Sequence, residues 1–252
     1  MPTALKAVSS ATASWTDAEW RMRVDLAAAY RLVDRYGMSD FIWNHITARV
    51  PGEEGHFLIN PFGLRYDEIT ASNLVKVKTD GTVIGGGETN YTGFVIHSAI
   101  HLARPDVACV LHTHTRAGCA VGCLEDGLLP FIQDGLSFHQ KVAYHDYEGL
   151  GVDLGERERI ARSLGDASCL FLRNHGLITV GRSVGEAFVL MVYFERACRV
   201  QVDILATGRP YRTVPKDIQL KAAAQYADYP PGEHEWPALV RLLDQKDPGY
   251  KA

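Results

Sequence analysis

The sequence predicts a layered α/β sandwich in which helices flank a mainly antiparallel sheet. Capped helical patterns occur near residues 16–37 and 183–208, and short apolar β-branched runs separated by turn sequences lie between them. Strands joined by short turns favour antiparallel pairing over a doubly wound parallel sheet. The chain has 252 residues, of which 46% are hydrophobic and 22% charged, so it can bury a full core, and we favour one domain over two.

The first helix is predicted to begin after Thr16 and to end at Gly37. Thr16 and Glu19 have the spacing of a capping box, apolar residues recur at helical intervals, and Gly37 suits a C-terminal cap. Between residue 41 and about residue 80, the runs ITARV, HFLI and LVKVK are separated by PGEEG, NPFG and TDG. This pattern predicts a meander of antiparallel strands.

The second half alternates between the two kinds of element. We expect a helix over residues 92–103, a buried strand over 107–112 and a helix of small residues over 115–123. Residues 169–181 indicate two strands with a turn at Asn174, His175 and Gly176. A capping box at Ser183 predicts a long helix that is closed by Gly208.

The two ends of the chain differ from this body. Residues 1–15 are predicted to form a disordered or extended arm, and residues 16–208 the domain itself. Residues 209–252 are proline-rich and contain two short helical patterns, IQLKAAAQYA and EWPALVRLLDQ. We expect this tail to pack on the body or on a neighbouring subunit.

Charge and hydropathy exclude several classes of partner. The net charge is -4 and no run of Lys and Arg is longer than a pair, which argues against nucleic acid and anionic membranes. The first residues lack the apolar region of a signal peptide, and no stretch approaches the roughly 20 apolar residues of a membrane span. The five cysteines suit a reducing compartment, so a cytoplasmic location is expected.

Two histidines in VLHTHTRAG are candidate metal ligands. His112 and His114 are two residues apart in a predicted strand, so their side chains project to the same side. His175, on the turn before Gly176, is the third candidate, and three ligands with one open position are typical of catalytic zinc. Three imidazoles also accept Mn²⁺ or Fe²⁺. The alternative is that these histidines are hydrogen-bonded core residues, which is more frequent for an arbitrary H-x-H.

The segments HSAIHLARPDVACVLHTHTRAG and FLRNHGLITVG together resemble the class II aldolase and adducin family. WNHITARV and FLINPFGLRYDEITASNLVKV are similar to its earlier motifs, so the likeness covers residues 17–208 in order, and INPFG, TGFVIHSAI, VAYHDYEG and RNHGL are closest to the adducin head domain. The resemblance implies a single three-layer α/β/α domain, often a tetramer with sites between subunits. It also implies zinc ligands at His112, His114 and His175.

The catalytic glutamate of the aldolases, which acts as acid or base, falls at Gly93 by this resemblance. Glu88, in a glycine-rich run, is the nearest upstream carboxylate and the candidate replacement, with a solvated loop acid as the alternative. His97 is expected to anchor its helix, and His101 to lie at the surface or at an interface.

The family's substrate-binding positions are partly kept. Asn44 and Gly63 are retained, whereas the serines that help to bind phosphate fall at Tyr91 and Thr92, and we take these four as the candidate substrate-binding residues. The phosphate-binding threonine falls at Phe62, which offers no donor for a phosphate dianion. A phosphorylated substrate is therefore disfavoured.

Three functions follow from these observations. The first is a metal-dependent carbon-carbon lyase of the class II aldolase type, acting as a homo-oligomer on a small, unphosphorylated hydroxy-carbonyl metabolite. The second is a metal-dependent decarboxylase of a hydroxy or oxo acid, because the departing carboxylate requires no prior deprotonation. The third is a non-catalytic interaction module like the adducin head.

Overall fold

The centre of the computed structural model, which describes residues 4–6 and 15–252, is an eight-stranded sheet with the order β5-β4-β3-β2-β7-β10-β9-β8. Neighbouring strands pair antiparallel except β8 and β9, which are parallel, so the sheet is mixed but mainly antiparallel. The strands are β2 (His45–Arg49), β3 (His56–Ile59), β4 (Val75–Lys78), β5 (Val83–Ile84), β7 (Cys109–Thr113), β8 (Val142–His145), β9 (Cys169–Leu172) and β10 (Gly176–Gly181).

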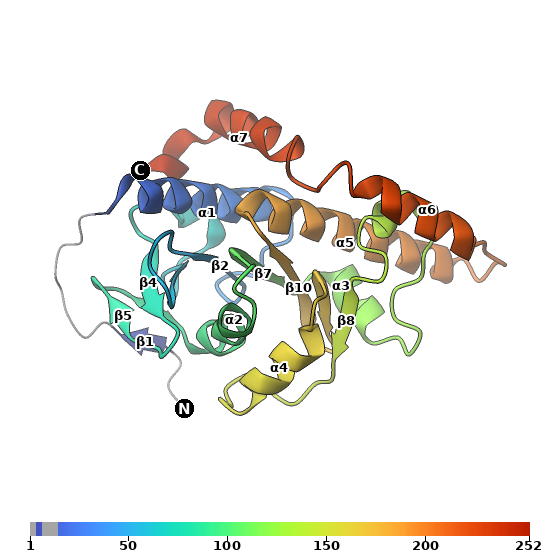
Figure 1. Ribbon diagram of the computed structural model, residues 1–252, viewed down its shortest axis with the longest axis horizontal. Helices are drawn as coiled ribbons and strands as arrows, with labels where there is room; N and C mark the ends of the chain where they lie inside the picture. The colour runs from blue at the N-terminus through green and yellow to red at the C-terminus, as the bar shows by residue number, and fades with distance from the viewer. Residues whose placement is uncertain (1–3, 7–14) are drawn as a thin grey trace.

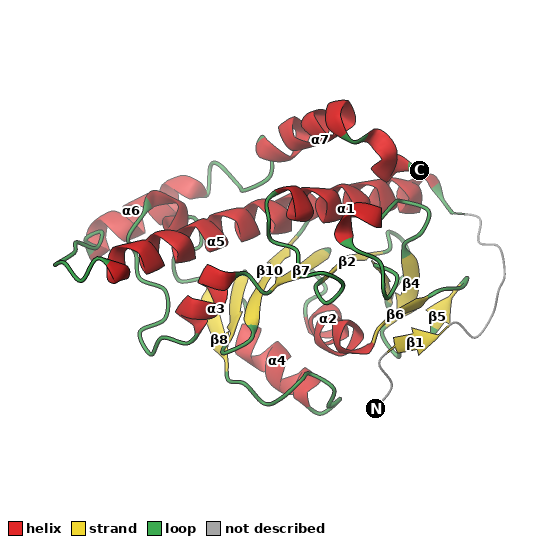
Figure 2. Ribbon diagram, turned by 180° about the vertical axis from the view of Figure 1, so that it is seen from behind, coloured by secondary structure: helices red, strands yellow, loops and turns green. Residues whose placement is uncertain are grey.

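Helices cover both faces of this sheet (Figures 1 and 2). One layer consists of α1 (Asp17–Arg35), α3 (Arg116–Gly122) and α5 (Val184–Ala206), whose apolar residues share one core cluster with the sheet. The other layer consists of α2 (Tyr91–Ala103) and α4 (Glu156–Leu164), which cover the opposite face through two smaller clusters. The expected single-domain α/β/α sandwich is thus confirmed.

The predicted helix ends are formed by the expected caps. Thr16 Oγ1 accepts a hydrogen bond from Glu19 N at 3.1 Å, and Ser183 Oγ accepts one from Glu186 N at 3.0 Å. Gly37 and Gly208, which follow α1 and α5, have φ angles of +67° and +62°, a conformation that glycine adopts without strain. Sequence and structure therefore agree on where the two longest helices begin and end.

The sequence pattern predicts no element within residues 142–164, where the structure contains β8 and α4. The strand lies at the edge of the sheet and is half-buried, so its residues do not form an apolar run. The helix buries only Glu156, Ile160 and Leu164 among charged neighbours. Because β8 is parallel to β9, a crossover must join them, and α4 is that crossover.

The tail of residues 209–252 lies against the body through α7 (Glu235–Lys246) and a terminal 3₁₀ turn (Pro248–Lys251). Figure 1 shows α7 above α1 and α5, where Leu243 and Tyr250 are buried. The helix α6 (Lys216–Tyr226) has no buried residue and lies on the outside. Two further 3₁₀ turns are η1 (Tyr66–Glu68) and η2 (Gln133–Leu136).

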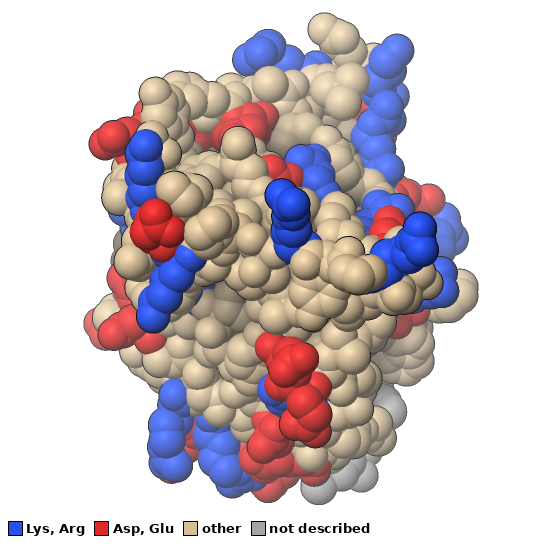
Figure 3. Space-filling view, turned by 90° about the vertical axis from the view of Figure 1, so that its right-hand side faces the viewer, with Lys and Arg blue, Asp and Glu red and all other residues tan. Residues whose placement is uncertain are grey.

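Most of the expected arm of residues 1–15 lies outside the described residues. Its described strand, β1 (Ala4–Lys6), pairs antiparallel with β6 (Glu88–Asn90) in a separate two-stranded sheet. Within the described ranges, no helix is both long and apolar enough to cross a bilayer. Acidic and basic side chains are interspersed over the face shown in Figure 3, with broad uncharged areas between them.

Candidate metal centre

Two segments bring the three candidate ligands to one end of β7, namely the end of this strand and the turn between β9 and β10. His112 is the fourth residue of this central strand and pairs with His45 of β2 and Ile178 of β10. His114 follows the last residue of the strand. His175 lies in the turn between β9 and β10.

The turn that carries His175 depends on the two residues beside it. Asn174 has a φ of +60°, a left-handed conformation that asparagine tolerates better than most residues. A Cβ atom at Gly176 would lie 2.4 Å from the carbonyl oxygen of Thr113. The sequence Asn-His-Gly therefore lets the turn approach the end of β7 closely enough to place His175 beside the other two rings.

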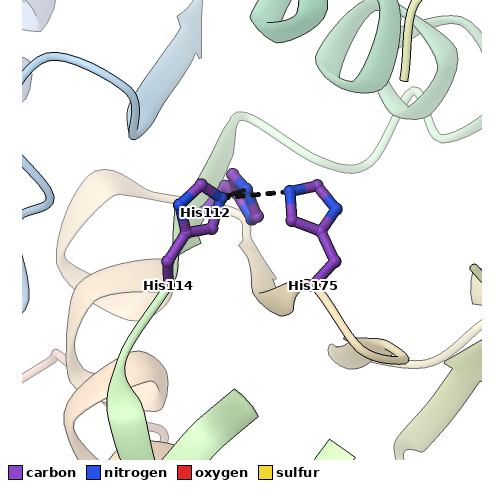
Figure 4. A group of neighbouring side chains, drawn as sticks. All are labelled: His112, His114 and His175. Carbon is purple, nitrogen blue, oxygen red and sulfur yellow. Dashed lines mark hydrogen bonds between the residues drawn. The ribbon is translucent and has the colours of Figure 1, made fainter. Parts of the chain in front are cut away.

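The three imidazoles point toward a common point (Figure 4). The Nε2 atoms of His112 and His114 are 2.8 Å apart, and those of His114 and His175 are 3.0 Å apart. One ligand atom from each ring lies within 4.8 Å of the others. Nitrogens bound to one tetrahedral zinc are roughly 3.3 Å apart, since each Zn–N bond is about 2.0–2.1 Å.

The remaining ring nitrogens show which tautomers these histidines adopt. His112 Nδ1 lies 2.9 Å from the carbonyl oxygen of Leu177, and His114 Nδ1 lies 2.9 Å from Asp40 Oδ2. Both oxygens can only accept, so both Nδ1 atoms carry the proton, and each ring when neutral has a lone pair at Nε2. Two lone pairs that face each other at this distance repel unless a cation lies between them. The donor set thus fits a divalent metal ion.

Burial keeps the rings of His112 and His175 unprotonated. It lowers the pKa of His112 well below its usual value, with further contributions from the positive forms of His114 and His175. Burial, followed by His114, lowers the pKa of His175 to about 4. Both rings are therefore neutral near pH 7, the form in which imidazole binds a metal.

The ligand cluster opens into a cavity of about 510 Å³. Its walls are mainly apolar, and the described residues that line it include no lysine or arginine. Asp40 is the one carboxylate among the described lining residues, and it is already hydrogen-bonded to His114. The lining residues are Asp40, Trp43, His45, Asn90, Thr92, Ile96, His112, His114, Tyr147, Gly149, Leu150, Val152 and His175.

The structure brings only one of the predicted substrate-binding residues to this cavity. Thr92 lines it and donates a hydrogen bond to Asn90 Oδ1 at 2.7 Å. Gly63 and Tyr91 are not in the lining. Asn44 is not in the lining either, but it is fully buried, and its amide has no hydrogen-bond partner among the described residues.

Glu88, the predicted acid or base, lies elsewhere. It is an exposed residue of β6, paired with the β1 strand, and it is absent from the cavity lining. The structure therefore does not bring its carboxylate to the three histidines.

The expectation for His101 was wrong, whereas that for His97 agrees with the structure. His101 is 3% exposed, and its Nε2 lies 2.8 Å from Thr47 Oγ1. Both histidines lie on the inner face of α2 and contact β2, because α2 packs directly on the sheet. His101 is thus part of the core.

One residue that the sequence analysis did not single out stands beside the ligands. His45 lines the cavity, and its ring stacks on that of His112 with the centroids 5.0 Å apart. A Cβ atom at Gly93 would lie 2.7 Å from Cδ2 of His45. His45 therefore occupies the space above Gly93, the position that the sequence resemblance aligns with the catalytic glutamate of the aldolases. The available signal was a histidine opening the strand HITAR, but its relation to His112 depends on the pairing register.

Comparisons with known proteins agree with this fold. The family model described as Class II Aldolase and Adducin N-terminal domain matches residues 24–202. A crystal structure of an aldolase II superfamily protein from Pseudomonas syringae has 47% identity and a TM-score of 0.89, covering 94% of this chain and 98% of that chain. An L-fuculose 1-phosphate aldolase from Glaciozyma antarctica has 29% identity and a TM-score of 0.79, covering 94% and 96%. Alpha-adducin from Rattus norvegicus is 46% identical over an alignment of 249 positions, which covers 91% of this chain but 34% of adducin.

Proposed function

We propose, from the premise that the chain belongs to the class II aldolase and adducin family, that it is a divalent-metal-dependent carbon-carbon lyase. Family membership supports an aldolase-type function. The observation that carries the proposal is the convergence of three imidazole nitrogens within 4.8 Å of one another at the wall of a cavity. Its substrate would be a small, unphosphorylated hydroxy-carbonyl metabolite.

His112, His114 and His175 would hold the ion, with Zn²⁺ the first candidate and Mn²⁺ or Fe²⁺ the alternatives. When bound, such an ion polarises a substrate carbonyl and stabilises the negative charge that develops as the carbon-carbon bond breaks. The protein orients two of the ligands through their Nδ1 atoms, with Leu177 fixing one ring and Asp40 the other.

The cavity walls support an unphosphorylated substrate. Phosphate sites in proteins use arginine, lysine or clustered N–H donors, and neither cation is present in this lining. Trp43, Ile96 and Leu150 provide apolar surface instead. We expect a substrate whose oxygens face the histidines and whose remaining carbon atoms contact these walls.

A specific observation favours decarboxylation as the second candidate. Cleavage of an aldol requires a proton to leave a hydroxyl group, and a positioned base contributes about 100-fold to 10,000-fold to that step. The one carboxylate of the lining, Asp40, is committed to His114. Loss of CO₂ from an oxo acid requires no such base, since the departing carboxylate is already ionised.

Turnover assays separate the candidates. Protein loaded with Zn²⁺, Mn²⁺ or Fe²⁺ is incubated with a panel of hydroxy-carbonyl compounds and of 3-oxo acids, whose loss of CO₂ leaves an enolate, and aldehyde and CO₂ are measured. Aldehyde release that is lost in His112→Ala supports the lyase, and CO₂ release supports the decarboxylase. Bound metal without any turnover favours the third possibility, a non-catalytic module.

Glu88 remains a candidate base that the same assays test. If Glu88→Gln lowers turnover by about 100-fold or more, the carboxylate acts in the reaction despite its place in β6. Turnover near the wild-type rate removes it from the mechanism.

We also propose self-association, with the cavity near a subunit interface. Leu150 and Tyr147, which line the cavity, are 75% and 52% exposed, and Phe41, which follows the lining residue Asp40 in the sequence, is 76% exposed. Large apolar side chains grouped on a surface indicate a contact with another protein. Light scattering after size-exclusion chromatography measures the mass directly; a monomer at all concentrations would contradict this assignment.

A further inference from the structure

A chain of hydrogen bonds runs from His45 at the cavity into the core. His45 Nδ1 lies 2.8 Å from His97 Nε2, and His97 Nδ1 lies 2.7 Å from Thr47 Oγ1. The same hydroxyl lies 2.8 Å from His101 Nε2. All four side chains are at least nine-tenths buried. The last atom of this series of hydrogen bonds, His101 Nδ1, is buried and has no hydrogen-bond partner among the described residues.

This last atom indicates the direction of every hydrogen bond in the chain. A buried N–H without an acceptor is rarer in proteins than an acceptor without a donor, so Nδ1 of His101 should be the unprotonated nitrogen. The positive charge of Arg49 near His101 disfavours a second proton on this ring, so the ring is neutral. A neutral imidazole has one N–H, so His101 carries its proton at Nε2 and donates it to Thr47.

The remaining protons follow in order. Thr47 has one hydroxyl proton and, because it accepts from His101, donates to His97 Nδ1. His97 then carries its proton at Nε2 and donates it to His45 Nδ1. His45, with Nδ1 as an acceptor, must carry its proton at Nε2. Its Nδ1 faces the core, and Nε2 has no hydrogen bond within the described chain, so this N–H is left for the cavity.

We propose that His45 is a substrate-binding residue of this site, whose Nε2–H donates a hydrogen bond to an oxygen of the molecule held at the three histidines. His97, Thr47 and His101 are positioning residues that hold His45 in this tautomer, and the absence of a side chain at Gly93 leaves the space for its ring. The identity of the bound molecule rests on the proposed function. The tautomer of His45 rests on the hydrogen bonds alone.

The chemistry suits a reaction that builds negative charge on oxygen. A neutral imidazole fixed as a donor stabilises a developing oxyanion without giving up its proton, because a preorganised donor needs no reorganisation as charge appears. The ring of His45 stacks on His112, so a small molecule at the ligand nitrogens lies next to it. His45 would thus contribute to binding in either the lyase or the decarboxylase.

Two measurements test this inference. Long-range proton–nitrogen NMR spectra of protein labelled with nitrogen-15 at histidine report the tautomer of His45, with His45→Gln used to assign its signal. The expected result is the Nε2–H form, with a shift toward the other tautomer in Thr47→Val. An Nδ1–H form in the wild type would overturn the inference, and this measurement requires no metal.

The second measurement is the affinity of the zinc-loaded protein for glycolohydroxamate, a chelating oxyanion probe, by calorimetry. His45→Leu is expected to weaken binding about tenfold to 100-fold with zinc content unchanged, whereas His45→Gln, which keeps an amide N–H, stays within about threefold. Equal affinity of wild type and His45→Leu would refute the role of His45 alone. A wild type that binds no metal would instead contradict the proposed function.

Discussion

A Cβ atom at position 93 would lie 2.7 Å from Cδ2 and 2.9 Å from Cγ of His45, so a side chain at this position and the observed place of the imidazole exclude each other. The two residues come from different elements, Gly93 from the first turn of α2 and His45 from the start of β2. Glycine at this position is therefore a requirement of the histidine that lines the cavity.

Replacement of Gly93 by alanine should move His45 out of its position. We expect the variant to lose about 1–3 kcal/mol of unfolding free energy through overpacking and to bind glycolohydroxamate more weakly, with its metal content unchanged. Denaturant titration and calorimetry measure the two effects. Gly135→Ala is the matched control, since its added Cβ would make an ordinary 3.7 Å contact with Ala197. Unchanged probe affinity in Gly93→Ala would show that His45 does not depend on this space.

Asp40 should act on the metal through His114. Its carboxylate accepts a hydrogen bond from His114 Nδ1 at 2.9 Å, and loss of such an orienting partner costs about 10-fold to 100-fold in metal affinity. Competition with a chelator measures this change in Asp40→Ala. Asp67→Ala, which removes an exposed partner of Arg65 far from the histidines in sequence, serves as the control. Equal affinities for all three proteins would remove Asp40 from the site.

The buried histidine chain should make stability depend on pH. Burial, followed by the charge of Arg49, lowers the pKa of His101 to about 3. The unfolded chain binds a proton at this residue below about pH 6.5 while the folded chain does not, so the folded state loses stability as the pH falls from about 6.5 toward 3. We expect the wild type to lose about 2 kcal/mol more than His101→Gln between about pH 7.5 and pH 5. Urea titrations measure this loss. If the wild type and His101→Gln lose the same unfolding free energy across this pH range, the assignment is contradicted.

Glu19 should be important for the attachment of α1 to the sheet. Its carboxylate, 1% exposed, lies 2.9 Å from the Arg23 guanidinium and 2.7 Å from Lys76 Nζ. Glu19→Ala leaves both cations buried without this partner, and we expect a loss of about 3–5 kcal/mol in unfolding free energy. Arg65→Ala removes an exposed ion pair and should leave the unfolding midpoint nearly unchanged. A similar, small effect of both substitutions would show that the buried network contributes little.

Local signals predicted much of this fold. The hydroxyl groups of Thr16 and Ser183 cap their helices because a cap depends on residues three positions apart. The side chain of Glu19, by contrast, binds Arg23 and Lys76 rather than completing the capping box, because it lies between a helix and a sheet that are distant in sequence. Among the buried residues of α4 only Ile160 and Leu164 are apolar, and the edge strand β8 is only half-buried, so neither element forms the long apolar pattern that marks a core element.

The candidate site likewise combines residues that local sequence patterns indicate with residues whose place depends on packing between distant segments. His112 and His114 were candidates because alternate residues of a strand project to one side, and His175 because it stands on a turn before glycine. The place of His45 depends on the register between β2 and β7, and the burial of His101 on the face that α2 turns to the sheet. Neither relation can be deduced from spacing along the chain.

The most direct test is elemental analysis of the purified protein after incubation with Zn²⁺, Mn²⁺ or Fe²⁺ and removal of free metal. If the three imidazoles bind one ion as proposed, the wild type retains about one divalent ion per chain and His112→Ala retains none. A wild-type protein that retains none of these metals, or a His112→Ala variant that retains as much as the wild type, would contradict the central claim.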